Sequence, residues 1–86
     1  MKELNLNSEV IVKLTDYGKE ILKSQGILNT VRIDENGYAN FQMWELMHYF
    51  GSHMFIGDTE LPFEQNSIII PDENLVEFRK EKTLYN

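Results

Sequence analysis

The first clear pattern in the chain is an alternation of apolar residues near its start. From Val10 to Leu14 the run is rich in β-branched residues, and Val10, Val12 and Leu14 share one face of an extended chain, which predicts a half-buried strand. Leu4 and Leu6 alternate with polar residues in the same way. They either extend this strand or form a separate edge strand.

A helical pattern follows the strand. Thr15 is a good N-cap, because its hydroxyl can accept a hydrogen bond from a free amide of the first turn. We expect the helix to run to about Gln25 and to end at Gly26, since glycine readily adopts the left-handed conformation of a C-terminal stop. Gly18 costs about 1 kcal/mol relative to alanine in a helix, so a close approach of another backbone would explain it. The apolar set of this helix is Tyr17, Ile21 and Leu22.

The strongest turn signal lies at residues 34–37, with the sequence Asp-Glu-Asn-Gly. Asn-Gly favours a tight turn because both residues tolerate positive φ. Residues 30–33 and 38–39 flank the turn. We therefore predict a short hairpin here.

The most amphipathic stretch is 41–50, which Asn40 can cap and Gly51 can end. At about 100° per residue, its large apolar side chains fall in one arc and its polar side chains in another. We predict a helix whose apolar arc packs on the sheet at the centre of the core. The apolar arc holds Met43, Trp44, Leu46, Met47 and Phe50, and the other arc holds Gln42, Glu45, His48 and Tyr49.

The C-terminal part has two further signals. Residues 67–70 are isoleucine-rich and predict a strand ended by Pro71, and Asp72 can cap a short helix to about Lys82. The predicted fold class is α+β. Its small sheet combines the N-terminal strand, the central hairpin and the isoleucine-rich strand, and two to three short helices pack on it. Residues 1–86 are expected to form a single compact domain, with 72–86 as a peripheral helix and tail.

Charge is unevenly placed along the chain. The net charge is −6, and no lysine or arginine occurs between Arg32 and Arg79. Such a field repels nucleic acid and anionic lipid and attracts basic surfaces. The acidity either keeps the protein soluble or marks an acidic interaction face. The candidate residues for that face are Asp34, Glu35, Asp58, Glu60 and Glu64.

The sequence contains no cysteine. This excludes a disulfide framework and thiolate metal sites, and it favours a reducing compartment. The N-terminal residues show no apolar stretch of signal-peptide length, and the longest apolar run is too short to cross a bilayer. We expect a cytoplasmic protein without membrane contact.

Catalytic patterns are missing from the sequence. Glu45 and His48 have the spacing of one helical turn, as in carboxylate-bridged metal sites, but such sites need several inward-facing pairs and here there is one, on the polar arc. Ser52 neighbours His53 in sequence, and sequence neighbours rarely point together. No nucleophile elbow, phosphate loop or dinucleotide fingerprint occurs. We predict no enzyme, no metal and no cofactor.

Two features bear on partners. Phe41 and Tyr49 lie at the edge of the polar arc and are the candidate aromatic interface residues. The step from Leu14 through Gly18 to Leu22 looks like the strand-to-helix step of some winged-helix regulators. A winged-helix domain needs a basic recognition helix, and 41–50 has no lysine or arginine, so direct nucleic-acid binding is not expected.

Several segments together resemble a family of small uncharacterised proteins from phages and prophages of Gram-positive bacteria. They are VKLTDYGKEIL at 12–22, DENGY at 34–38, FQMWELM at 41–47, Phe50-Gly51, Gly57, LPFE at 61–64 and Asn66. The resemblance covers roughly residues 10–70. It implies a phage accessory protein in the host cell cytoplasm and no activity or catalytic residue.

Three hypotheses about function follow. The first is a non-enzymatic phage accessory protein that binds another protein, such as an acidic inhibitor of a basic host nucleic-acid-binding or defence protein. The second is a winged-helix-like transcriptional regulator. The third is a homodimeric structural or assembly module held by exposed aromatic side chains.

Overall fold

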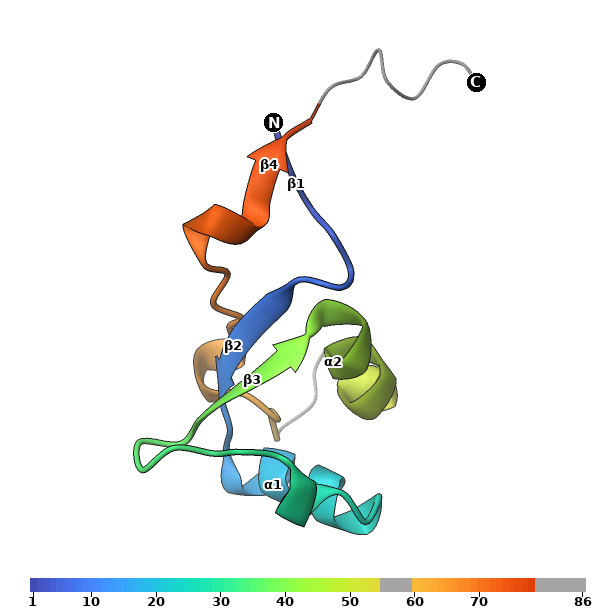
Figure 1. The fold of residues 1–86 in the computed structure, drawn as a ribbon. Helices are drawn as coiled ribbons and strands as arrows, with labels where there is room; N and C mark the ends of the chain where they lie inside the picture. The colour runs from blue at the N-terminus through green and yellow to red at the C-terminus, as the bar shows by residue number, and fades with distance from the viewer. Residues whose placement is uncertain (55–59, 79–86) are drawn as a thin grey trace.

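A computed structural model of the protein describes residues 1–54 and 60–78 and has an α+β fold (Figure 1). In the described residues, two α-helices and four strands are present, and the strands pair antiparallel in two separate two-stranded sheets. The α+β class predicted from the sequence is confirmed. The elements are β1 (Lys2–Leu4), β2 (Glu9–Lys13), α1 (Asp16–Ser24), β3 (Tyr38–Gln42), α2 (Met43–Phe50) and β4 (Leu75–Glu77), with 3-10 turns at Leu28–Thr30, Gly51–His53, Glu64–Asn66 and Asp72–Asn74.

The core forms where α1 and α2 meet the buried face of the β2–β3 pair. Val10 and Val12 of β2 are fully buried, as predicted, and they pair with Phe41 and Ala39 of β3. Leu14 continues the same buried face. The helices contribute Ile21, Leu22, Leu46 and Phe50 to this cluster.

The start of α1 is built as the sequence predicts. The Thr15 hydroxyl accepts a hydrogen bond from the Gly18 amide at 3.0 Å, and Gly26 adopts φ +76° just after the helix. A Cβ atom placed on Gly18 would lie 2.2 Å from the Pro62 carbonyl oxygen. The predicted close approach of a second backbone to Gly18 is therefore confirmed.

The approaching backbone belongs to Leu61, Pro62 and Phe63, which we call the strap. The strap accepts two hydrogen bonds from Thr15: the amide donates to the Pro62 oxygen at 3.1 Å and the hydroxyl to the Leu61 oxygen at 2.5 Å. Phe63 is buried, with its ring centroid 4.9 Å from that of Phe50. One threonine thus caps α1 and fixes the strap to it.

The second helix begins later than predicted. Asn40 and Phe41 belong to β3, and α2 starts at Met43 with Gln42 as its N-cap. Gln42 and Glu45 form a capping box, in which the Glu45 carboxylate accepts from the Gln42 amide at 3.0 Å. Phe41 alternates with Ala39 toward the core, and this strand periodicity overrides the helical one.

The predicted burial of the α2 apolar arc is correct only in part. Leu46 and Phe50 are fully buried, whereas Trp44 and Met47 are 46% and 47% exposed. The helix is only eight residues long, and it reaches the core with Leu46 and Phe50 while Met43 and Tyr49 pack against the core's edge. The sequence predicted that Trp44 packs in the core, and this prediction is wrong because nearly half of the side chain is exposed.

The predicted hairpin also differs. The turn at 34–37 forms, with Gly37 at φ +92° and the Asp34 carboxylate accepting from the Asn36 and Tyr38 amides. However, β3 pairs along its whole length with β2, and residues 30–33 contribute only one bridge, between Ile33 and Ala39. The chain at Leu28–Thr30 is a 3-10 turn, which keeps most of 30–33 away from a strand.

The C-terminal helix prediction is wrong over the described residues. Asp72–Asn74 makes one 3-10 turn, and Leu75–Glu77 then forms β4, which pairs antiparallel with β1. The β1–β4 ribbon pairs Leu4 with Leu75 and extends beyond the main body (Figure 1). Cross-strand pairing here prevails over the weak helix signal of a short segment. The rest of the predicted helix, from 79, lies outside the described residues.

In the described ranges, no helix has both the length and the apolar composition required to cross a membrane.

The approach of the strap to Gly18 leads to a test. Gly18→Ala should lower the free energy of unfolding by about 3 kcal/mol, because the added methyl group would collide with the Pro62 carbonyl. Gly51→Ala is the matched control. Gly51 has φ −55° and no described atom within 4 Å of the added carbon, so this change should raise stability by about 0.5 kcal/mol. Urea unfolding of both variants measures the difference, and equal stabilities would contradict the packing described.

Candidate functional site

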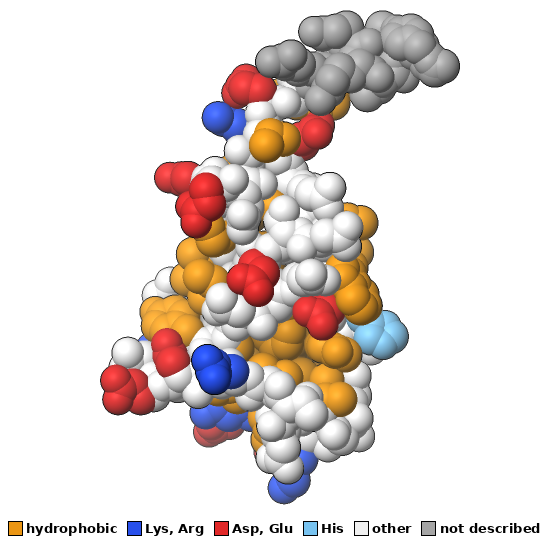
Figure 2. Space-filling model, viewed as in Figure 1, with side chains coloured by type: hydrophobic (Ala, Val, Ile, Leu, Met, Phe, Trp, Pro, Cys, Tyr) orange, Lys and Arg blue, Asp and Glu red, His pale blue; other side chains and the backbone are white. Residues whose placement is uncertain are grey.

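An apolar group of side chains lies exposed on α2 and beside it. We call it the α2 face and define it as Leu6, Trp44 and Met47, which are 55%, 46% and 47% exposed. Trp44 and Met47 are one helical turn apart, and the Trp44 amide donates to the Leu6 carbonyl at 3.0 Å, which brings Leu6 to the start of the helix. Figure 2 shows hydrophobic side chains gathered at the surface over α2.

Trp44 is also held in one orientation. Its indole N–H donates to the Gln42 side-chain oxygen at 2.5 Å, and Gln42 itself belongs to the capping box of α2. A rigid, half-exposed indole loses little conformational freedom when another surface covers it. The α2 face therefore presents a preorganised aromatic side chain to solvent.

The aromatic interface predicted from the sequence is not where the structure has exposed aromatic surface. Phe41 is 3% exposed and belongs to the core, so its assignment as an interface residue is wrong. Tyr49 is half-buried, and its ring packs edge-to-face on Phe41 at 6.1 Å between centroids. Trp44 and Met47 were missed because their helical spacing predicts a core face.

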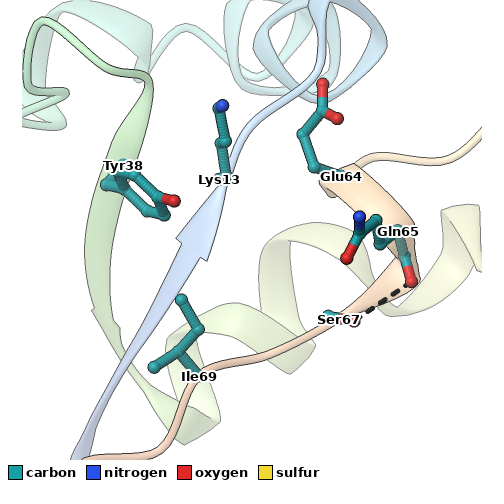
Figure 3. Close-up of a pocket in the computed structure, with 6 residues that line it drawn as sticks. All are labelled: Lys13, Tyr38, Glu64, Gln65, Ser67 and Ile69. Carbon is teal, nitrogen blue, oxygen red and sulfur yellow. Dashed lines mark hydrogen bonds between the residues drawn. The ribbon is translucent and has the colours of Figure 1, made fainter.

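A hollow of about 240 Å³ lies on the solvent side of β2 (Figure 3). Lys13 and Glu64 stand on opposite sides of it and extend in the same direction, and the Lys13 ammonium is 5.7 Å from the centroid of the Tyr38 ring. Gln65, Ser67 and Ile69 complete the wall. Most of these side chains are exposed, so the hollow is an open surface feature rather than a closed ligand site.

Gln65 and Asn66 give this part of the surface its shape. Both adopt positive φ, at 55° and 54°, although neither is glycine. They lie between two bridges, one from Ile11 of β2 to Ile69 and one from Leu14, just after β2, to Phe63. Two residues of β2 therefore face five residues of the partner segment, and the extra residues bulge outward at Gln65 and Asn66.

The predicted acidic residues are exposed but spread out. Asp34 and Glu35 lie at the turn before β3, Glu60 borders a second hollow of about 320 Å³ near Asp16, and Glu64 borders the hollow of Figure 3. On the face seen in Figure 2, carboxylates are scattered from one end to the other. Asp58 lies outside the described residues.

The residues weighed for metal binding have other surroundings. Glu45 serves the capping box of α2, and His48 is exposed beside Tyr49. His53 packs edge-to-face on Tyr17, with 6.4 Å between the ring centroids. Within 1–54 and 60–78, no three His, Asp or Glu side chains are grouped closely enough to hold a metal ion.

Comparison with known proteins finds no matching family model, no similar curated protein and no similar solved structure.

The bulge at Gln65 gives a second test. Gln65→Gly should stabilise the fold by about 0.5–1 kcal/mol, because glycine adopts positive φ without the steric cost that a Cβ atom imposes. Asn66→Gly should gain less, since asparagine tolerates this region better than glutamine. Thermal unfolding of the two variants compares them. A loss of stability in Gln65→Gly would contradict the left-handed conformation.

Proposed function

We propose that this protein is a non-enzymatic protein-binding module, in keeping with the phage accessory role that its sequence motifs imply, and that the α2 face is its main contact surface. The observation that carries the proposal is the exposure of Trp44 on a helix that buries Leu46 and Phe50 on its other side. Tryptophan is the residue most enriched among those that dominate binding energy at protein interfaces.

The support for this surface comes from its composition and its rigidity. Leu46 and Phe50 anchor α2 in the core, so Trp44 and Met47 are carried by a rigid element rather than by a loop. Met47 adds a flexible, polarizable side chain that adapts to the shape of a partner. The exposed residues of α2 include no lysine or arginine, which favours a protein partner over nucleic acid.

The negative net charge of the protein favours one class of partner. A protein with net charge −6 associates fastest with a surface of opposite sign. Basic surfaces are typical of proteins that bind nucleic acid, so a host nucleic-acid-binding or defence protein fits the charge. In this proposal Glu60 and Glu64 steer the encounter, and the α2 face supplies the contact that holds the complex.

The contribution of Trp44 can be measured directly. The protein is used to capture partners from the lysate of its native host, and the retained protein is purified and titrated with wild type and variants. Trp44→Ala should weaken binding about 30-fold or more, the effect of losing a dominant interface residue. Val76→Ala, a truncation of a 52% exposed side chain on β4, should leave the affinity unchanged.

Trp44 is the only tryptophan, so its fluorescence reports on the same contact. Covering the indole by the partner should shift its emission to shorter wavelength. If wild type and Trp44→Ala bind the partner with equal affinity, and the emission of wild type does not change on binding, the α2 face is not the contact surface. A concentration-dependent dimer in sedimentation, abolished by Trp44→Ala, would assign the α2 face to self-association instead.

A further inference from the structure

The isoleucine segment, defined as Ile68, Ile69 and Ile70, lies along the edge of β2 opposite β3. Ile69 exchanges two backbone hydrogen bonds with Ile11, at 2.9 and 2.7 Å. In an extended antiparallel chain, the backbone groups of successive residues point to opposite sides. The N–H and C=O groups of Ile68 and Ile70 therefore point away from β2.

This outer edge is open in the described structure. Ile68, Ile69 and Ile70 are 36%, 46% and 38% exposed. No hydrogen bond joins the backbone of Ile68 or Ile70 to any residue of 1–54 or 60–78. An exposed apolar edge with unpaired backbone groups is a template for the addition of another strand.

The ends of the edge limit what can pair with it. The bulge at Gln65 and Asn66 ends the regular geometry on one side, and Pro71, which lacks an N–H, ends it on the other. Bulges and prolines protect edges from open-ended aggregation. Only Ile68 and Ile70 remain as outward-facing positions, so the edge suits one short strand.

The charged residues on either side of the isoleucine segment favour one kind of added strand. Residues 65–71 carry no charge, but exposed Glu64 precedes them and exposed Asp72 and Glu73 follow them. Lys13, across the hollow from Glu64, is the one lysine or arginine among the described residues that line this hollow. If a second copy paired antiparallel with Ile68 opposite Ile70, Glu64 of one copy would lie near Asp72 and Glu73 of the other, and like charges close together repel. A strand with basic residues at both ends meets attraction at both ends.

We propose that the isoleucine segment docks an extended segment of a partner protein, with apolar residues flanked by lysine or arginine, as an added β-strand. The proposal rests on the proposed protein-binding function and extends it to a second surface. This edge lies on the far side of β2 from β3, and β3 leads directly into α2. Variants of the α2 face and of this edge can therefore be tested separately.

The probe is a seven-residue peptide, acetylated and amidated, with two lysines at each end and valine-threonine-valine in the middle. It is titrated into the ¹⁵N-labelled full chain at low salt. The amide signals of Ile68 and Ile70 should shift and their exchange should slow, while Trp44→Ala binds like wild type. Replacing the four lysines by glutamate should weaken binding about tenfold or more, since the flanking carboxylates then repel the peptide.

Ile68→Pro is the diagnostic variant, because it removes an outward N–H while Ser67, at φ −119° and ψ 146°, already has a backbone compatible with a following proline. It should weaken peptide binding about tenfold or more, whereas Ile68→Ala keeps the N–H and loses less. A peptide methylated on the backbone nitrogens that face the edge gives the same test without changing the protein.

Several results would overturn the proposal. They are unchanged Ile68 and Ile70 signals at peptide excess, equal binding of the backbone-methylated peptide, or equal binding of the glutamate peptide. A dimer that Ile68→Pro abolishes would assign the edge to a second copy instead. If Trp44→Ala binds the peptide like wild type, the result supports this edge even where the α2 face binds no partner. The two proposals can therefore fail independently.

Discussion

The structure depends on the pairing of β2 along both of its edges. The backbone groups of Val10 and Val12 point toward β3, and those of Ile11 hydrogen-bond to Ile69 on the other edge. One five-residue strand therefore joins segments from the middle and the end of the chain. The side chains of Val10 and Val12 are at the same time fully buried in the core. In so short a chain few other elements can organise the fold, and a two-stranded pair alone would be marginal in water.

The remaining contacts extend from this strand. Leu14 pairs with Phe63, which brings the strap onto Gly18 and lets Thr15 serve both the helix and the strap. Asn74 donates to the Glu9 carbonyl at 2.8 Å and ties the C-terminal turn to the other end of β2. Leu46 and Phe50 are buried in the core and Met43 and Tyr49 pack against it, whereas Trp44 and Met47 stay at the surface of α2. The candidate contact surface is thus a consequence of how small the core is.

The sequence predicts what depends on neighbours along the chain. The alternation of Val10 and Val12, the Thr15 cap, the turn at 34–37 and the backbone approach at Gly18 are all local signals, and each is confirmed. The errors concern partners distant in sequence. Phe41 and Trp44 both fit a helical arc, and only the pairing of β3 with β2 decides that Phe41 is buried and Trp44 exposed. Likewise, β4 exists because β1 lies beside it.

Amide hydrogen exchange at β2 tests the two-sided pairing most directly. The amide of Ile11 should be protected to a degree similar to those of Val10 and Val12, because the isoleucine segment covers one edge of β2 and β3 covers the other. Rapid exchange at Ile11, with slow exchange at Val10 and Val12, would show β2 to be an edge strand and would contradict its pairing along both edges.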